Sequence, residues 1–405
     1  MAASVLVLGG GFAGLAAVRE LARRVRAGLD VSVRLVDERP YSLFSPMLPD
    51  VISGRVSADH LRYPLAPYCR WLGVEFIQAA VQEISPGGGL VRTDREVLDA
   101  DYMIVCLGCK TNYFGDEQMA ARAPGLKSVE EGLAIRADAA RRVQCGAGGI
   151  TQRQRAHFIV VGGGYTGFEA ASHLAHLLRR LTGLPYGRLK EACGILILER
   201  GKEALRNVSP AARLWALDLI RGYGLEVRTG VSIQAFEPDS SIRVSDGSVL
   251  ENAAVIWAAG VTPGPAVSRM ESAKGQGGRL AVDECLRLRG AGAVFAAGDV
   301  AAAMPQGTEA PLRMAVQFSL AGGRCAAVNV ARAVEGRPPL PFRPADLGYV
   351  VPLAPGHAAG MVLGRELHGR LPYGLHYLMC ILRSWGWRNR AGVLGDLFTG
   401  GRYDE

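Results

Sequence analysis

Two glycine-rich turns about 150 residues apart are the groups in this chain whose spacing most clearly predicts chemistry. The glycines of the two turns are Gly9, Gly11, Gly14 and Gly162, Gly164, Gly167. At this spacing the first glycine allows a tight turn, the second lets backbone N–H groups approach a pyrophosphate, and the third lets helix and strand pack closely. The chain is therefore predicted to bind two dinucleotides, although a glycine turn without a ligand is the alternative for each copy.

Each turn lies between the elements that such a site requires. The strands predicted before the turns are Ser4–Leu8 and Phe158–Val161, and the helices predicted after them are Leu15–Arg24 and Glu169–Leu181. Further strands are predicted at Asp101–Val105, in the β-rich stretch that ends in Ala254–Gly260, and at Ala293–Asp299, and a helix at Ala58–Tyr68. The polar stretch Cys145–Arg155 is predicted to lead into the second turn.

A carboxylate ends the strand that follows each predicted helix. Strand Val31–Val36 runs into Asp37, and strand Gly194–Leu198 runs into Glu199. An acid at this place accepts hydrogen bonds from an adenosine ribose, and Glu199 would repel a 2′-phosphate, which favours NADH over NADPH. Arg200 and Lys202 weaken that preference, and a solvated strand end remains the simpler reading of each acid.

Composition limits the other classes of function. The 405 residues, with 49% hydrophobic residues and 52 glycines, are typical of an α/β protein of two or three domains. The net charge of +8 would suit an anionic surface, but no nucleic-acid motif accompanies it, so nucleic acid is not an expected partner. No segment has the roughly 20 apolar residues of a membrane span. The apolar start lacks the basic residues of a signal peptide, so an intracellular protein is expected.

The eight cysteines show neither a disulfide framework nor metal-ligand spacing. Cys106 and Cys109 form a CxxC pair where a predicted strand runs into a loop. Buried or incidental thiols are favoured there over a redox dithiol. No catalytic cysteine and no metal site are predicted.

The chain resembles the two-dinucleotide-binding-domain flavoproteins, and among them the type II, non-proton-pumping NADH:quinone oxidoreductases. The segments that carry this resemblance are Tyr41–Tyr63, Thr111–Gly115, Gly162–Glu169, Trp257–Val261, Gly298–Asp299 and Gly386–Arg390. The resemblance implies an α/β fold of two Rossmann-like domains, the NAD domain inserted in the FAD domain, plus a C-terminal membrane-facing segment. The implied ranges are 1–115 and 271–345 for FAD, 116–270 for NADH and 346–405 for the membrane segment.

The same resemblance implies cofactors, partners and site residues. FAD and NADH are the cofactors, a quinone is the acceptor, and the enzyme is a peripheral respiratory-chain protein on the cytoplasmic side of the cell membrane, with a homodimer left open. The implied FAD residues are Gly9, Gly11, Phe12, Ala13, Gly14, Asp37, Gly108, Gly298, Asp299 and Gln317. The implied NADH residues are Gly162, Gly164, Tyr165, Thr166, Gly167, Glu169, Glu199, Ala259 and Gly260. Glu169 and Gln317 are the implied catalytic residues.

Three of these roles depend on a local prediction. A helix is predicted over Leu312–Glu335 from Pro311, and its N-terminal dipole would stabilise reduced flavin. Glu169 is expected in the first helical turn, either facing nicotinamide or complementing the helix dipole. Tyr165 could gate the flavin face. The stretch Val316–Gly323 departs from the family, because it keeps Gln317 and Gly323 but lacks the later glutamines that contact a quinone head group.

The C-terminal stretch predicts membrane contact. Its apolar residues are Leu375, Leu378, Met379, Ile381 and Leu382, and its interfacial and basic residues are Arg383, Trp385, Trp387, Arg388 and Arg390. A core-packed helix ending on a basic surface is the alternative.

Other functions stay open at this point. A sulfide:quinone oxidoreductase would need a cysteine pair, for which Cys145 and Cys325 are candidates. A soluble NADH-dependent reductase of a small redox protein would not bind lipid. A non-enzymatic NADH-sensing flavoprotein would form a long-lived complex with NADH and pass electrons to no acceptor.

Overall fold

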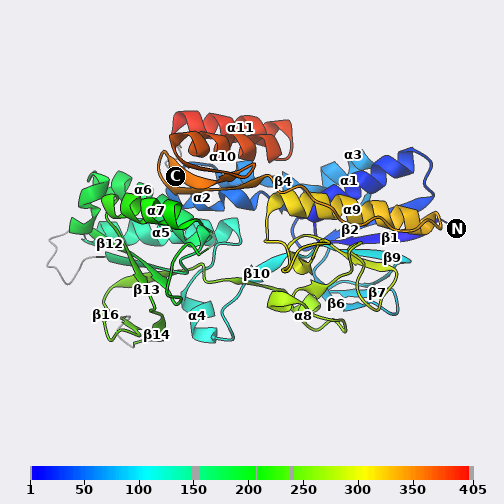
Figure 1. Cartoon of the computed structure of the whole chain (residues 1–405), viewed down its shortest axis with the longest axis horizontal. Coiled ribbons are helices and arrows are strands. Elements are labelled where there is room, and N and C mark those ends of the chain that lie inside the picture. The colour runs from blue at the N-terminus through cyan, green and yellow to red at the C-terminus, as the bar shows by residue number, and fades with distance from the viewer. Residues whose placement is uncertain (1, 147–155, 207, 238–240, 401–405) are drawn as a thin grey trace. The chain divides into compact units, whose positions relative to one another are not determined.

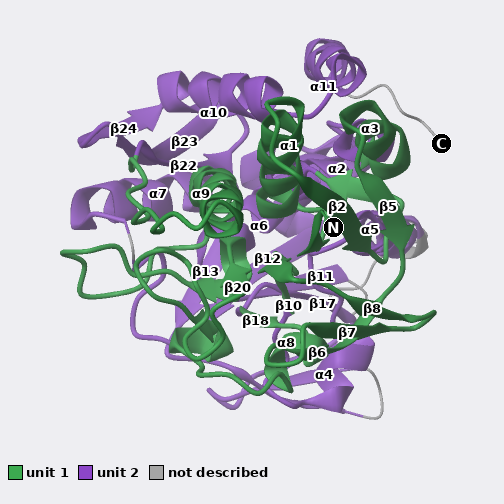
Figure 2. Ribbon diagram, turned by 90° about the vertical axis from the view of Figure 1, so that its right-hand side faces the viewer, with its two compact units in different colours: residues 1–43, 63–110, 261–346 green, residues 44–62, 111–260, 347–405 purple. Residues whose placement is uncertain are grey.

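The computed structural model describes residues 2–146, 156–206, 208–237 and 241–400 (Figure 1). The chain divides into two compact units, and each unit is assembled from three separate stretches (Figure 2). Unit 1 comprises residues 1–43, 63–110 and 261–346, and unit 2 comprises residues 44–62, 111–260 and 347–405. The domain boundaries at 115, 270 and 345 stay a prediction, because the units record which residues pack together and not which nucleotide they bind.

Unit 1 is built on a parallel sheet in the order β20-β9-β1-β2-β5. Its strands are β1 (Ala3–Leu8), β2 (Val31–Asp37), β5 (Glu75–Gln78), β9 (Tyr102–Val105) and β20 (Val294–Ala296). The central strand β1 is buried from Val5 to Leu8, as a parallel strand covered on both faces must be. The strand predictions for this part of the chain are confirmed.

Two long helices of unit 1 pack on each other beside this sheet (Figure 1). They are α1 (Phe12–Arg26) and α9 (Val316–Val334). The other elements of the unit are α3 (Leu65–Leu72), α8 (Pro265–Ser268), the antiparallel strands β6 (Val81–Ser85), β7 (Leu90–Thr93) and β8 (Val97–Asp99), and the short pair β19 (Leu280–Ala281) and β21 (Ala301–Ala302).

Unit 2 repeats the pattern with a parallel sheet in the order β13-β12-β11-β17. Its strands are β11 (Ala156–Val161), β12 (Cys193–Glu199), β13 (Leu225–Thr229) and β17 (Ala253–Trp257). Helix α6 (Tyr165–Thr182) follows the second glycine turn and is buried from Gly167 to Leu178 at most positions. The predicted strands and helix are confirmed here as well.

The chain's last 59 residues belong to unit 2 rather than standing apart. They form an antiparallel sheet whose strand β22 packs on α6, followed by two helices. These elements are β22 (Gly348–Ala354), β23 (His357–Val362), β24 (Arg365–Gly369), α10 (Arg370–Arg383) and α11 (Trp387–Thr399). The remaining helices of the unit are α2 (Leu48–Ser53), α4 (Glu117–Arg122), α5 (Val129–Gly146) and α7 (Pro210–Gly222).

The shorter elements complete the chain. The strands are β3 (Tyr41–Leu43), β4 (Arg62–Pro64), β10 (Cys109–Thr111), β14 (Ile233–Phe236), β15 (Ile242–Val244), β16 (Val249–Leu250) and β18 (Val261–Pro263). The 3₁₀ turns are η1 (Ser45–Met47), η2 (Ala58–Leu61), η4 (Tyr186–Glu191), η5 (Gln276–Gly278) and η6 (Gly298–Val300). 

Two helix predictions are wrong. Residues 58–68 do not form one helix, because η2 gives way to β4 and α3 begins only at Leu65, after Pro64. This break is what a proline imposes on the residue before it. Helix α9 begins at Val316 and not near Pro311, since Ala315 still has an extended backbone. Of the predicted link at 145–155, only residues 145–146, the end of α5, lie within the described part of the chain.

Candidate functional site

The glycine turn of unit 1 has the backbone geometry that its sequence predicts. Gly9 has φ +100°, and a Cβ atom there would lie 2.5 Å from the Cys106 carbonyl oxygen. A Cβ atom on Gly14 would lie 1.8 Å from the Gly9 oxygen, so only glycine lets α1 pass this close to the turn. Gly11 caps α1 with open space around its Cα. The helix N-terminus therefore presents free space and partial positive charge where a pyrophosphate would bind.

The turn of unit 2 has nearly the same dimensions. Gly162 has φ +114°, and its Cβ would lie 2.4 Å from the Ala258 oxygen. A Cβ on Gly167 would lie 1.9 Å from the Gly162 oxygen, and Gly164 caps α6 with open space around it. Both predicted glycine turns thus have the backbone geometry that a nucleotide cradle requires, one in each unit.

Each strand-end acid is tied to its own cradle. The Gly10 N–H donates to Asp37 Oδ2 at 2.6 Å, and the Gly163 N–H donates to Glu199 Oε2 at 2.8 Å. Burial raises the pKa of Asp37, while the N–H groups of Gly10 and Arg39 act in the opposite direction. A carboxylate has about four lone-pair positions, so each acid still has oxygen sites available for ribose hydroxyls.

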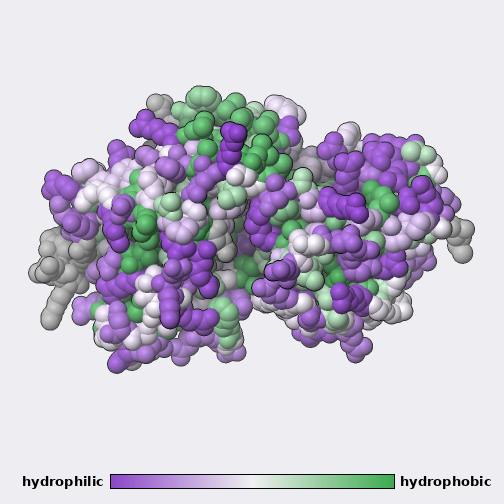
Figure 3. Space-filling model, in the orientation of Figure 1, coloured by the Kyte–Doolittle hydropathy of each residue, from purple (hydrophilic) through white to green (hydrophobic). Residues whose placement is uncertain are grey.

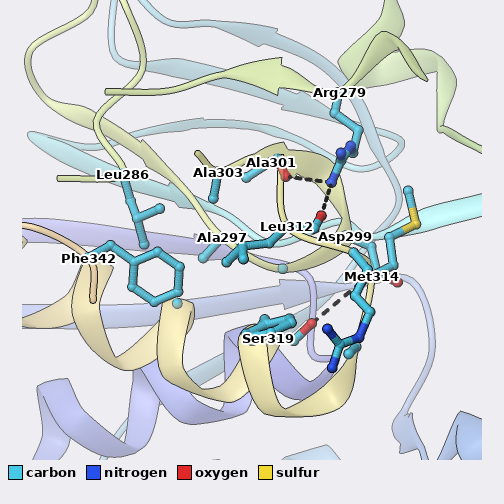
Figure 4. A pocket seen from close by; sticks show the side chains of 15 residues that line it. Arg279, Leu286, Ala297, Asp299, Ala301, Ala303, Leu312, Met314, Ser319 and Phe342 are labelled. Carbon is cyan, nitrogen blue, oxygen red and sulfur yellow. Dashed lines mark hydrogen bonds between the residues drawn. The ribbon is translucent and has the colours of Figure 1, made fainter. Parts of the chain in front are cut away.

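A small pocket in unit 1 lies between η6 and the start of α9 (Figure 4). Asp299 lies on η6, and the Ser319 hydroxyl lies 3.5 Å from its Oδ1 atom. Arg279, only 7% exposed, donates from Nη1 to the carbonyls of Ala301 and Leu312 at 3.2 and 3.1 Å. Burial lowers the pKa of Arg279, whereas Cys109 and Asp299 raise it. The pocket combines a carboxylate with a buried cation, a set suited to polar groups of a bound cofactor.

Arg279 also explains why α9 begins late. Arg279 donates a hydrogen bond to the Leu312 carbonyl. The next residue, Arg313, forms a bidentate ion pair with Asp346, with both N–O distances 2.6 Å. These contacts hold residues 312–313 outside the helix. Gln317 lies in the first turn of α9, where its Nε2 donates to Asp346 Oδ1 at 3.0 Å. The dipole of α9 therefore begins at Val316.

Gly323 has a packing role in this structure. A Cβ atom there would lie 2.0 Å from the carbonyl oxygen of Ala13, because α9 passes directly over α1. Gly298, with φ +79°, is less tightly confined, since its Cβ would lie 3.0 Å from that of Ala13. The glycine at 323 is thus explained by helix contact, independently of any quinone.

Glu169 is the fifth residue of α6 and not in the first turn, so that prediction is wrong. Glu169 is half-buried as a whole residue, and its carboxyl group is buried. This burial, together with the negative charge of Asp50, raises the pKa of Glu169 to about 8. An acid that only complemented the helix dipole would be expected nearer the N-terminus and with its ordinary acidity.

The other predicted site residues lie in the same unit as the turn to which they were assigned. Phe12 and Ala13 open α1, and Gly108 follows β9 with φ +64°. Thr166 is exposed in the first turn of α6. The Gly260 carbonyl, next to Ala259, accepts from Asn112 N–H at 3.0 Å. Every predicted FAD residue belongs to unit 1 and every predicted NADH residue to unit 2.

Tyr165 has an aromatic partner. Its ring stacks on that of Tyr349 from β22, with 5.3 Å between ring centroids. A gating movement of Tyr165 would have to break this stacking.

The cysteines have the properties of structural residues. Burial raises the pKa of Cys106 to about 12 and that of Cys325 to about 11, which disfavours the reactive thiolate. Cys106 and Cys109 are not joined by a disulfide bond, and Cys109 Sγ lies 3.4 Å from the Asp299 carbonyl oxygen. The side chain of Cys145 lies outside the described residues.

A buried polar cluster in unit 2 was not predicted. Asp50, Ser53, His173 and Tyr377 are all less than 7% exposed and come from α2, α6 and α10. A lone acid in the apolar segment Leu48–Ser53 was the available signal, because buried carboxylates need partners.

The outer faces of α10 and α11 carry two apolar rows. On α10 Leu371, Leu378 and Leu382 are 51–73% exposed, and on α11 Trp387, Leu394 and Phe398 are 43–84% exposed. Each row follows the helical repeat. Among the described residues, no helix has the length and apolarity needed to cross a bilayer.

Two compact units with one nucleotide cradle each define a dinucleotide-dependent oxidoreductase fold. The sequence model of the family described as pyridine nucleotide-disulphide oxidoreductase matches residues 3–321, which is most of the chain. The protein belongs to this family.

Individual proteins of known sequence or structure are similar to this chain over most of its length. A type II NADH:quinone oxidoreductase of Staphylococcus saprophyticus is 29% identical over 370 residues, which cover 90% of this chain and 91% of the relative. The structure of NDH2 from Plasmodium falciparum in complex with NADH is similar to this one, with a TM-score of 0.86 and 17% sequence identity. The similarity covers 100% of this chain and 99% of the NDH2 chain. The structure of the sulfide:quinone oxidoreductase of Aquifex aeolicus has a TM-score of 0.75 at 17% identity, and the similarity covers 96% of this chain and 92% of the Aquifex chain.

Proposed function

We propose that this protein is a FAD-dependent, non-proton-pumping NADH:quinone oxidoreductase. The observation that carries the proposal is the presence of two complete nucleotide cradles, one per unit, in a chain similar along 90% of its length to type II NADH:quinone oxidoreductases. The substrates are NADH and a quinone.

Unit 1 would hold FAD. The N–H groups before α1 would bind its pyrophosphate, Asp37 its adenosine ribose, and Asp299 a ribityl or phosphate-side oxygen. Bound flavin supplies a centre that accepts a hydride and passes two electrons onward. The N-terminus of α9 at Val316 supplies partial positive charge in the same unit.

Unit 2 would hold NADH. Glu199, fixed by Gly163 and Gly201 N–H groups at 2.8 and 2.7 Å, would accept the ribose hydroxyls and repel a 2′-phosphate. Glu169, protonated near neutral pH, would orient the nicotinamide by donating a hydrogen bond. Ala259 and Gly260 would line the same nucleotide.

Gln317 would contact the quinone or the flavin edge in the second half of the cycle. The support is its place in the first turn of α9, where Asp346 fixes its amide. Since the later glutamines of related enzymes are missing, Gln317 would carry more of the quinone recognition here.

The C-terminal helices would attach the enzyme to a membrane surface. Green, hydrophobic atoms gather on the outer side of α10 and α11 in Figure 3, where the two apolar rows lie. Arg370, Arg383, Arg388 and Arg390 accompany them, and the one carboxylate between 370 and 400, Asp396, is buried. This combination fits the interface of an anionic bilayer. We place the enzyme on the cytoplasmic face, where NADH is available, and leave a homodimer as a prediction.

Stopped-flow absorbance of the FAD-loaded protein tests the proposal. Flavin should bleach rapidly with NADH, more slowly with NADPH, and be reoxidised rapidly by a short-chain quinone. Gln317→Ala should slow reoxidation about tenfold or more and leave bleaching within about twofold. Bleaching without reoxidation by quinone would overturn the proposal and favour a protein acceptor or NADH sensing.

A further inference from the structure

Unit 2 contains a cavity of about 360 Å³ that is separate from its glycine turn. Small-molecule sites typically have volumes of about 300–1,000 Å³. The cavity is lined by residues of α4, α5, β11, β14 and β17. Within β17 the lining runs from Ala253 to Ile256, whereas Ala258 makes the close contact with the Gly162 turn. The cavity therefore lies along the edge of the sheet, on the amino-terminal side of the turn where a nucleotide would bind.

This edge of the sheet has a buried backbone donor. β17 is the last strand in the order β13-β12-β11-β17, and on its outer edge Trp257 N–H donates to the Pro124 carbonyl at 2.8 Å. Val255 N–H faces the same edge, because alternate residues of a strand direct their N–H groups to the same side. Val255 is 4% exposed and lines the cavity, and no acceptor for its N–H is found within the described part of the chain. A buried donor of this kind favours a ligand that supplies an acceptor.

Arginine side chains give the lining an excess of positive charge. Arg142, with a side chain 19% exposed, donates from Nε to Asp138 Oδ2 at 2.7 Å. Arg141 also pairs with Asp138, so the one carboxylate of the lining is already matched by two cations. Arg122 adds a further cation, whose guanidinium lies 5.3 Å from the centroid of the Phe236 ring and for which no ion pair is found among the described residues. The cavity is therefore suited to an anion.

The cation and the backbone donor lie in the same part of the lining. Arg122 is two residues before Pro124, and Val255 is two residues before Trp257. The hydrogen bond between Pro124 and Trp257 thus brings the two segments side by side. A carboxylate, which accepts up to about four hydrogen bonds, can use a guanidinium and an N–H group together.

The rest of the lining is mainly apolar. Ile135 of α5, Phe158 of β11 and Ile256 of β17 are at most 4% exposed. Ala134 of α5 also lines the cavity and is exposed, four residues before Asp138 on the same face of the helix. A ligand with an apolar body would be stabilised by the surface that it removes from water.

We propose that this cavity binds a small amphiphilic carboxylate. Its apolar body would lie between α5 and β17, and its carboxylate would accept from Arg122 and from Val255 N–H. The ligand site is distinct from the place proposed for NADH, and the inference does not depend on the proposed function.

Calorimetric titration of the full-length, FAD-loaded protein with naphthoate at neutral pH tests the proposal. Naphthoate carries one carboxylate on an apolar body, and naphthamide has the same shape without the charge. Naphthoate should bind in a one-to-one ratio with a dissociation constant below about 100 µM. Naphthamide should bind about tenfold more weakly or less, because it lacks the charge-assisted hydrogen bond.

An arginine variant tests the charge. Arg122→Gln should weaken naphthoate binding about tenfold or more. Arg179→Gln is the matched control, because Arg179 is likewise exposed in the last turn of a helix and lies 5.2 Å from the centroid of the Tyr186 ring, outside the cavity. The control should change the affinity less than about twofold.

A second variant fills the cavity without removing a charge. Ala134→Phe should abolish naphthoate binding, because the added ring would occupy the space of the ligand. Ala137→Phe is the control, since Ala137 is also exposed on α5 but does not line the cavity. Both residues are on the surface of the helix, so thermal unfolding should be similar in the two variants.

Hydrogen–deuterium exchange locates the ligand. Naphthoate should slow exchange in residues 134–142 and 253–256 and leave residues 162–167 unchanged, and saturating NADH should not displace it. Absence of saturable binding up to about 1 mM, equal binding of naphthamide, or displacement by NADH would overturn the proposal. A protein that quinone does not reoxidise would contradict the proposed function and leave this binding result unaffected, so the two proposals fail separately.

Discussion

Glu199 accepts a 2.8 Å hydrogen bond from the N–H of Gly163, which lies inside the turn where a pyrophosphate would bind. The acid proposed to bind ribose and the backbone turn proposed to bind pyrophosphate in unit 2 are therefore joined by a hydrogen bond. Asp37 and Gly10 repeat this arrangement in unit 1 at 2.6 Å.

Glu199→Gln should raise the NADH concentration needed for half-maximal flavin bleaching about tenfold, because an amide replaces a charge-assisted acceptor. The bleaching rate at saturating NADH should stay within about twofold, and the preference over NADPH should weaken. Stopped-flow titration with both nucleotides measures this. Glu203→Gln, at a 58% exposed side chain paired with Arg213, is the control. Equal losses for NADH and NADPH would contradict the 2′-phosphate argument.

Gly323→Ala should destabilise unit 1 by about 1–3 kcal/mol, since the added methyl group would lie 2.0 Å from the Ala13 carbonyl oxygen and backbone must move. Thermal unfolding followed by circular dichroism and the flavin content of the purified protein are the measurements, and both should fall.

Gly395→Ala is the control for the Gly323→Ala substitution. Gly395 is also a helical glycine, in α11, but has open space around it. Alanine there should be neutral or stabilising by up to about 1 kcal/mol. A similar loss of stability for both variants would mean that the α1–α9 contact is not the cause.

The stability of unit 2 should fall as pH rises from about 4 to 8. Asp50 and Glu169 have folded-state pKa values of about 6 and about 8, above their ordinary values of 3.8 and 4.5. The folded chain therefore holds more protons than the unfolded chain in this window, and its stability declines as they are lost. Below both ordinary values the stabilising effect is complete.

Urea unfolding at pH 5 and pH 8 tests this dependence. Asp50→Asn should reduce the difference by about 1–3 kcal/mol, because an uncharged amide does not titrate and Glu169 then ionises more easily. Asp396→Asn is the control, because Asp396 is another buried carboxyl of unit 2 and its partner is His60. An unaltered pH dependence in Asp50→Asn would show that Asp50 is ionised in the folded chain at all these pH values.

Replacing Trp387 and Phe398 together with serine should weaken binding to vesicles of phosphatidylglycerol and phosphatidylcholine tenfold or more, since both side chains are over 80% exposed. Flotation of the FAD-loaded protein at two salt concentrations measures this. The paired control replaces Trp71 and Leu214, which are 67% and 66% exposed on other helices. An equal loss in the control would argue against a specific face.

The sequence was sufficient for features that depend on local backbone geometry. Both glycine turns, their strands and the two strand-end acids could be predicted. A backbone at φ +100°, or a helix that touches the turn before it, requires glycine, and glycine is visible in the sequence. The start of α9 could not, since it depends on Arg279, which lies 33 residues before the carbonyl that it binds.

Contacts between residues far apart in the chain also explain why the properties of Glu169 and the buried polar cluster of unit 2 were not predicted. Glu169 was expected to respond to a helix dipole, but its proton affinity depends on burial and on Asp50, over a hundred residues away in the chain. Tyr377 and His173 are ordinary in sequence and become notable only where α2, α6 and α10 meet.

The near-identity of the two glycine turns has a kinetic consequence. In the proposed cycle one nucleotide remains bound through many turnovers while the other leaves after each, yet the close contacts of the turns differ by only 0.1 Å between units. Residence time is therefore not set by the phosphate cradle. In unit 1 the backbone contact between Gly323 and Ala13 fastens α9, next to the residues assigned to flavin, onto the helix that opens the cradle. In the proposed cycle, the longer residence time of the nucleotide in unit 1 is therefore expected to depend on the packing of α9 against α1 rather than on the glycine turn itself.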